Sequence, residues 1–154
     1  MTNPAPSAHT RTTAVQRALH AVACLERIPY SVLAIPLRLA VATVFWSSAM
    51  SKLANWDTAL ELFREEYRVP LLPPELAAYL AVSIELTTPV LLVLGLAARP
   101  VALVLLGMTA VIEVFVYPQA WPTHIQWAAM LLVLLSRGAG DWSVDRWLWT
   151  RFGR

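Results

Sequence analysis

The fold is decided by residues 76–117, which read LAAYLAVSIELTTPVLLVLGLAARPVALVLLGMTAVIEVFVY. Two apolar runs, Leu76–Leu96 and Val101–Tyr117, are joined by a tight turn at Gly95–Pro100. A helix that crosses a bilayer needs roughly 20 mostly apolar residues, and both runs are close to that length. These residues therefore predict two membrane spans that form an antiparallel hairpin.

Two more apolar runs lie on either side of this hairpin in the sequence. The earlier one covers Tyr30–Met50, and the later one runs from about His124 to Leu135. The later run is the shortest, because its uninterrupted apolar part extends only from Trp127 to Leu135. Together the four runs predict an all-α fold, an integral membrane four-helix bundle that occupies residues 30–148.

The composition supports a membrane protein and excludes several other classes. Hydrophobic residues make up 58% of the 154 residues and charged residues only 14%, against about 25% charged residues in an ordinary soluble domain. The mean hydropathy is +0.56. The single cysteine, Cys24, excludes an internal disulfide, a CxxC redox pair and a cysteine-based zinc site. The basic residues are dispersed, so the net charge of +2 reports membrane topology rather than nucleic-acid binding.

The remaining segments are expected outside the bilayer. Residues 1–13 lack apolar periodicity and are predicted to be a disordered tail. Residues 14–28 carry apolar side chains at helical spacing, which predicts an amphipathic interfacial helix or else a helical lead-in packed on the bundle. Residues 52–75 mix apolar and charged side chains before a proline-rich end, which predicts a surface helix between spans 1 and 2. Residues 149–154 form a basic tail.

The distribution of Lys and Arg predicts the orientation of the chain. The side with the N-terminus, the turn at Arg99 and the C-terminal tail carries most of the arginines, whereas the opposite side carries only Lys52, Arg64 and Arg68. Basic residues are enriched on the cytoplasmic side of membrane proteins. We therefore expect both termini in the cytoplasm and the chain in a bacterial inner (plasma) membrane, with the lipid bilayer as its first partner.

Five ionisable side chains lie within or at the ends of the apolar runs: Arg38, Lys52, Glu85, Glu113 and His124. A charge in the hydrocarbon layer costs at least about 2.5 to 3.5 kcal/mol, so such side chains normally face a protein interior or a wet cavity and pair with one another. Lys52 lies at a span end, where a lysine usually extends its amine to the membrane surface. The other four predict a buried polar site.

Counting along the helices predicts that three of these groups share one depth. Glu85 and Glu113 each lie fourteen residues from Arg99, and His124 lies thirteen residues from Arg137. At 1.5 Å per residue, all three come out at roughly 20 Å from the cytoplasmic boundary. We therefore predict that the three groups lie in one layer, and in an enzyme interpretation Glu85, Glu113 and His124 are its catalytic, proton-exchanging groups.

Helical phase predicts the groups that surround them. Arg38 comes out at roughly 16 Å by the same count and is expected to compensate Glu85 or Glu113. Hydroxyl groups share the helix faces of the two glutamates. The predicted ligand-binding residues are therefore Arg38, Thr88, Thr109 and Tyr117. A metal site is not predicted, because the arginine competes for the carboxylates and no close ligand spacing is present.

Three sequence elements occur in an order that is typical of a known family. Arg38 is followed by Lys52 at the close of the first span, and Glu85 precedes the turn LLVLGLAAR at 91–99. The third element is HIQWAAMLLVLLSRGAGDWSVD at 124–145. In these elements the chain resembles the DoxX family, including DoxD-like proteins, which are small four-helix membrane proteins.

The resemblance covers about Pro36–Leu148 and includes two departures from the usual pattern. Glycines often found before the lysine and after the glutamate are replaced by Ser48 and Ala49 and by Thr87–Pro89. Small residues still permit close helix contact. The departures therefore concern the shape of a pocket beside Glu85 rather than the fold.

The resemblance implies a membrane subunit linked to sulfur oxidation or redox-stress handling, sometimes the quinone-facing part of a thiosulfate:quinone oxidoreductase. The implied cofactor is a quinone. None of the side chains carries electrons by itself, so this enzyme interpretation requires a bound cofactor or a soluble or membrane redox partner protein.

Two alternatives to the enzyme interpretation stay open at this point. In the first, the chain is a non-catalytic membrane scaffold or assembly partner whose buried charges only fix helix packing. In the second, the polar layer is a path for a small solute or a proton, which requires so small a chain to form a homo-oligomer.

Overall fold

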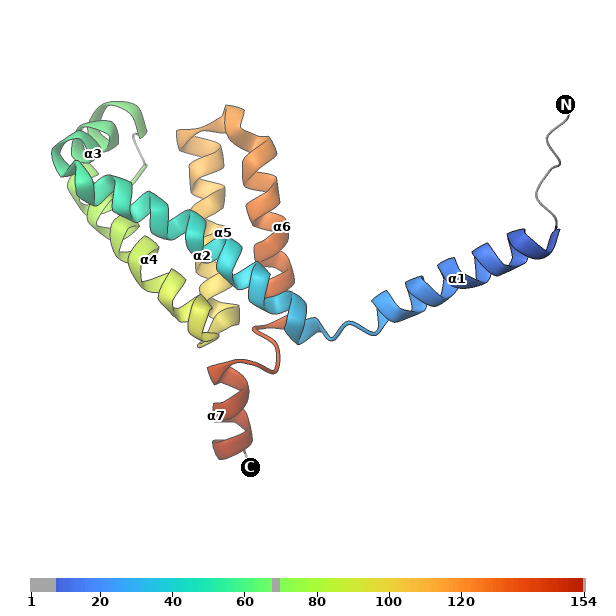
Figure 1. Cartoon of the computed structure of the whole chain (residues 1–154). Helices are drawn as coiled ribbons and strands as arrows, with labels where there is room; N and C mark the ends of the chain where they lie inside the picture. Colours follow the sequence, from blue (N-terminus) through green and yellow to red (C-terminus); the bar gives the residue numbers. More distant parts are fainter. Residues whose placement is uncertain (1–7, 68–69, 154) are drawn as a thin grey trace, which may run out of the picture. The chain divides into compact units, whose positions relative to one another are not determined.

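The computed structural model describes residues 8–67 and 70–153, and in this part of the chain every regular element is helical (Figure 1). The seven α-helices of the described part are α1 (Ala8–Glu26), α2 (Tyr30–Ala54), α3 (Trp56–Leu62), α4 (Pro74–Leu94), α5 (Ala98–Val111), α6 (Trp121–Arg137) and α7 (Val144–Phe152). Short elements adjoin them, namely the π-helices η1 (Phe63–Tyr67) and η2 (Ile112–Val116) and the 3-10 helix η3 (Pro118–Ala120). The predicted all-α class is confirmed.

The chain divides into two units, residues 1–30 and 31–154. The first unit contains α1, which begins at Ala8, so residues 8–13 of the predicted disordered tail are helical. Residues 1–7 of that tail lie outside the described residues. The helix ends at Glu26, shortly before Pro29, because a proline disfavours helical conformation in the residue that precedes it.

Among the described residues, three helical segments are long and apolar enough to cross a membrane: α2, α4 and the continuous segment Ala98–Val116, in which η2 extends α5. They correspond to the first three predicted spans. The predicted fourth span corresponds to α6, which has 17 residues and is not among the three candidates in the described part of the chain. Its first turn contains Pro122 and His124, which leaves a shorter apolar run than in the other three helices.

The helices α2, α4, α5 and α6 form a bundle whose two ends carry different elements (Figure 1). The short helices α3, η1, η2 and η3 gather at one end, called here the α3 end, and α7 lies at the opposite end, called the α7 end. The predicted surface helix within 52–75 is therefore present as α3 and η1. Residues 149–152 of the predicted basic tail belong to α7, and Arg154 lies outside the described residues.

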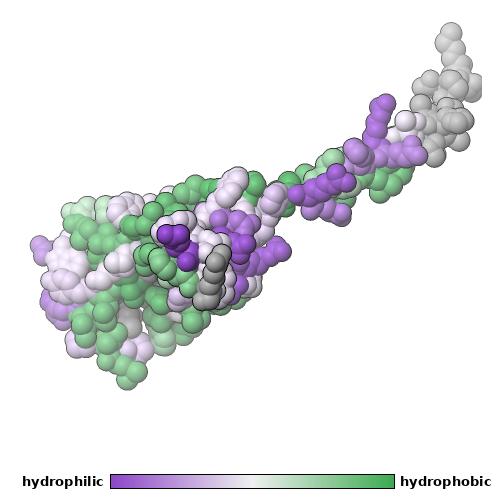
Figure 2. Space-filling model, turned by 90° about the horizontal axis from the view of Figure 1, so that it is seen from below, coloured by the Kyte–Doolittle hydropathy of each residue, from purple (hydrophilic) through white to green (hydrophobic). Residues whose placement is uncertain are grey.

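Large apolar side chains from all four bundle helices meet in one core. Phe45, Leu92, Leu105 and Leu131 are each at most 1% exposed and belong to this cluster. Many other apolar side chains lie on the outside of the helices, and Figure 2 shows them as extensive green areas. Exposed apolar surface on this scale is unusual for a soluble monomer and fits a surface that faces lipid.

Residues 138–145, which comprise the connection from α6 and the first two residues of α7, join the elements at the α7 end of the bundle. The Ser31 hydroxyl of α2 donates to Asp141 Oδ2 at 2.7 Å and accepts the Asp141 backbone N–H at 2.9 Å. The Asp145 carboxylate accepts the backbone N–H groups of Ala97 and Ala98, at 2.7 and 2.9 Å. This carboxylate satisfies donors that the first turn of α5 leaves free and lies favourably at the positive end of the helix dipole.

The turn between α4 and α5 requires a glycine at position 95. Gly95 has φ of +67°, and a Cβ placed there would lie 2.3 Å from Arg38 Nη1 and 2.6 Å from the Ser143 Cβ. The Gly95 carbonyl also accepts the Asp145 backbone N–H at 3.0 Å. The close approach of α2, the turn and the 138–145 segment therefore depends on the missing side chain.

We predict that Gly95→Ala destabilises the protein by about 1 to 3 kcal/mol. The alanine backbone is strained at this positive φ, and the new methyl group collides with neighbouring side chains. Chemical denaturation of the purified protein in detergent measures the change. Gly107→Ala is the matched control, since a Cβ at Gly107 meets nothing within 4 Å. Equal stability of the two variants would contradict this account of the turn.

Candidate functional site

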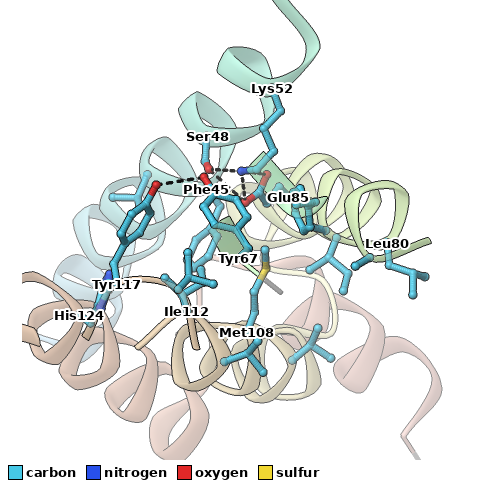
Figure 3. A pocket seen from close by; sticks show the side chains of 18 of the residues that line it. Phe45, Ser48, Lys52, Tyr67, Leu80, Glu85, Met108, Ile112, Tyr117 and His124 are labelled. Atoms are coloured by element: carbon cyan, nitrogen blue, oxygen red, sulfur yellow. Dashed lines mark hydrogen bonds and ion pairs between the residues drawn. The ribbon is translucent and has the colours of Figure 1, made fainter. Parts of the chain in front are cut away.

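A cavity of about 540 Å³ lies in the half of the bundle near the α3 end (Figure 3). Its wall is mainly apolar, with side chains from α2, η1, α4, α5, η2 and α6 that include Phe45, Phe63, Leu80, Ile84, Met108, Ile112 and Trp127. Polar side chains also reach it, namely Ser48, Lys52, Tyr67, Glu85, Tyr117 and His124. Its volume falls in the usual range for a small-molecule site, and a mostly apolar wall with a few polar groups is the usual composition.

The first polar group of the cavity wall is an ion pair between α2 and α4. Lys52 Nζ lies 2.9 Å from both carboxylate oxygens of Glu85, and the Ser48 hydroxyl donates to Glu85 Oε1 at 3.0 Å. Lys52 also donates to Ser48 Oγ at 2.7 Å. The Glu85 side chain is 1% exposed and the Lys52 side chain 18% exposed. Ser48 and Lys52 lie one helical turn apart, so one face of α2 supplies both donors.

This ion pair differs from the predicted arrangement of the arginine and the lysine. Lys52 was expected to extend to the membrane surface, but its amine turns inward to Glu85. Arg38 was expected beside a glutamate, but its Nη2 donates to the Trp142 carbonyl at 3.0 Å, next to the α4–α5 turn. The two cations lie on one stripe of α2, about 21 Å apart along the axis at 1.5 Å per residue. Only Lys52 is therefore level with the cavity.

The second polar group is a dyad formed by η2 and α6. His124 Nδ1 and Glu113 Oε2 lie 2.6 Å apart, with side-chain exposures of 6% and 32%. The donor and acceptor roles in this contact depend on the tautomer of the imidazole: when an ionised Glu113 accepts from Nδ1, Nε2 of a neutral ring is the nitrogen that can accept. His124 lines the cavity and packs on Trp127 with ring centroids 5.0 Å apart. The imidazole of the dyad thus lies at the cavity wall.

The third polar group is a pair of tyrosines at the α3 end of the cavity. The hydroxyls of Tyr67 and Tyr117 lie 3.1 Å apart, and their rings meet edge to face. Each tyrosine stands at the end of a π-helical segment, since Tyr67 closes η1 and Tyr117 follows η2. Burial, followed by the hydrogen bond to Tyr117, raises the pKa of Tyr67 well above its usual range. Its phenol therefore stays protonated at neutral pH.

Two of the predicted ligand-binding hydroxyls are used within their own helices. The Thr88 hydroxyl donates to the Ile84 carbonyl at 2.6 Å, and the Thr109 hydroxyl donates to the Leu105 carbonyl at 2.8 Å. Both side chains are buried, and neither is among the residues that line the cavity. The structure thus brings Glu85, His124 and Tyr117 to the cavity wall and places Glu113 behind His124.

Sequence reasoning missed Ser48 and Tyr67 and misassigned Lys52. The spacing of Ser48 and Lys52 was a usable signal, since residues four apart on a helix share a face. No comparable signal existed for Tyr67, because its segment lies outside the predicted spans and its depth could not be counted from a membrane boundary. Within residues 8–67 and 70–153, no group of three or more His, Cys, Asp or Glu side chains is placed to hold a metal ion.

These features define a small helical membrane protein with a partly open, ligand-sized cavity whose wall carries the buried Lys52–Glu85 pair and further polar groups. The family model described as DoxX matches residues 33–118, which is more than half of the chain, so the chain belongs to the DoxX family. The match includes Arg38, Lys52 and Glu85 and ends before His124. Comparison with curated proteins gives no match, and comparison with solved structures gives none either.

We predict that removal of one partner of the Lys52–Glu85 pair destabilises the protein by about 3 kcal/mol, the lower end of the range for a buried pair, because Lys52 retains some exposure. Lys52→Met and Glu85→Gln should each show this loss in chemical denaturation in detergent. The double variant should recover much of it, since no uncompensated charge then remains.

The matched control is the same set of single and double variants at the surface pair Arg64–Glu75, whose side chains are 51% and 49% exposed. Substitutions in such an exposed pair should change the stability by less than about 1 kcal/mol. The two single variants and the double variant together give the coupling energy between Lys52 and Glu85. A coupling energy as small as that of the control pair would show that Lys52–Glu85 is not buried in the folded protein.

We predict that the Tyr67–Tyr117 hydrogen bond limits access to the cavity from the α3 end. Loss of a hydrogen bond worth about 1 kcal/mol should raise an open population about fivefold. The measurement is the rate at which N-ethylmaleimide labels Met108→Cys, a cavity-lining position, in a Cys24→Ser background. Tyr67→Phe should raise this rate, whereas the control Tyr79→Phe, whose ring packs on Trp56 away from the cavity, should not. Equal rates in both variants would rule out the hydrogen bond as a barrier.

Proposed function

We propose that this DoxX-family protein is a redox-associated membrane subunit that binds a quinone in the 540 Å³ cavity. The observation that carries the proposal is the combination of a mainly apolar wall with three separate polar groups on it. A ligand that has a flat apolar ring and polar oxygens on its edge matches this combination. A quinone, when bound, supplies two-electron, two-proton redox chemistry.

The charge balance of the cavity supports a quinone over a sulfur oxyanion. Lys52 is compensated by Glu85, and the dyad of Glu113 and His124 carries one negative charge while the imidazole is neutral. An anionic substrate such as thiosulfate would enter a mostly apolar space with no uncompensated cation at its wall, at a large desolvation cost. A neutral ring avoids that cost. Sulfur chemistry, in this proposal, belongs to a partner protein.

The residues of the cavity take distinct roles in the proposal. His124 accepts a proton at Nε2 from a ligand hydroxyl and returns it in the reverse direction, while Glu113 holds its tautomer through Nδ1. Lys52 and the tyrosine hydroxyls donate hydrogen bonds to ligand oxygens. Electrons come from a redox partner protein, because none of the side chains in the chain carries them alone.

The proposal includes the membrane arrangement. We take α6 as a fourth span, since its 17 residues extend about 25 Å and its buried face packs along α5. Arginines are concentrated at the α7 end, so this end is proposed to face the cytoplasm. The cavity and the Tyr67–Tyr117 pair then lie toward the opposite surface.

The test is the quinone content of the protein isolated in native-lipid particles, measured by mass spectrometry relative to phospholipid. Ala81→Trp fills the cavity and should lower the bound quinone at least about tenfold, because overpacking excludes a ligand of this size. Leu103→Trp is the matched control, since Leu103 is 57% exposed on the outside of α5, and it should leave the content unchanged.

Equal quinone content in wild type and Ala81→Trp would mean that the quinone belongs to the surrounding lipid, and would overturn the proposal. No ligand together with a stably bound partner protein would instead favour the scaffold interpretation, in which the Lys52–Glu85 pair only fixes helix packing.

A further inference from the structure

The helix α1 exposes a continuous apolar stripe. Val15, Leu19, Val22 and Leu25 are 58%, 63%, 51% and 65% exposed. Their spacing of three and four residues places them on one face of the helix. Figure 2 shows exposed green apolar groups along this helix next to purple hydrophilic ones. A helix with this surface requires an apolar phase or partner on one side.

The opposite face of α1 is polar and basic. Arg17 and His20 project from the side away from the stripe, and Arg27 follows at the end of the helix. Glu26 is the single acidic residue in the sequence from Ala8 to Pro29. A basic polar face opposite an aliphatic stripe is complementary to a surface that combines anionic headgroups with acyl chains.

The connection of α1 to the rest of the chain favours a membrane over other occupants. Only residues 27–29 separate the end of α1 from α2, a candidate span, and a connection of this length reaches at most about 14 Å. The C-terminal end of the helix is therefore held close to a bilayer surface. A second copy of α1 is a weaker occupant, because a stripe that covers only Val15 to Leu25 is short for a stable coiled coil.

We propose that α1 binds the surface of the bilayer as an interfacial helix that recognises anionic phospholipid. The side chains of the stripe insert at the boundary between headgroups and acyl chains. Arg17 and Arg27 contact anionic headgroups. This role is independent of the cavity and of any ligand bound there.

The test uses the full chain reconstituted in vesicles of phosphatidylcholine, with or without phosphatidylglycerol, in a Cys24→Ser background. A fluorophore is attached either at Leu19→Cys on the stripe or at Gln16→Cys beside the polar face, and doxyl-labelled lipid is the quencher. With phosphatidylglycerol, quenching at position 19 should exceed quenching at position 16 at least about threefold, as for a helix buried on one face. The double variant that combines Arg17→Gln and Arg27→Gln should reduce that difference in quenching, and high salt should reduce it as well.

The alternative outcomes are distinct. Equal quenching at the two positions would overturn the interfacial orientation. Quenching at position 19 that is the same with and without phosphatidylglycerol would overturn the recognition of anionic lipid. Fluorophore self-quenching that grows with protein density, without quenching by doxyl lipid, would assign the stripe to a second copy of the chain and overturn the proposal.

Discussion

The arrangement of the bundle depends on the compensation of one buried carboxylate. Glu85 is 1% exposed in the middle of a candidate span, where an unpaired charge is not tolerated. Lys52 and Ser48 satisfy both of its oxygens from one face of α2, which brings the second half of α2 against the centre of α4. Because these donors point inward, one wall of the cavity is polar although most of its lining is aliphatic or aromatic.

At the α7 end of the bundle, a second buried cation donates to a backbone carbonyl, and a carboxylate accepts backbone N–H groups. Arg38 donates to the Trp142 carbonyl, and Asp145 accepts the backbone N–H groups that open α5. The short 138–145 segment thereby contacts both α2 and the α4–α5 turn at Gly95. Polar contacts therefore join the helices at two levels, the centre of α4 and the α7 end.

The sequence predicted the three long spans and the burial of Glu85 and His124, because hydropathy and helical counting depend only on local spacing. It did not predict which cation compensates Glu85. Helical phase places Arg38 and Lys52 on one stripe of α2 but says nothing about which acceptors lie at each height. That choice depends on a carbonyl supplied by Trp142, far away in the sequence. The sequence also did not predict that the Thr88 hydroxyl lies away from the cavity wall and donates to the preceding turn of its own helix, as a threonine in a helix can.

The two carboxylates of the cavity region differ in their hydrogen-bond partners. Glu85 accepts from Lys52 at both oxygens and from Ser48 at one, so the loss of its charge would leave the Lys52 ammonium without its partner. Glu113 is 32% exposed and has His124 as its hydrogen-bond partner in the described part of the chain. A change at this dyad therefore breaks no contact between α2 and α4. In the proposed function, Glu85 then holds the two helices together, and His124, held by Glu113, exchanges the proton with the ligand.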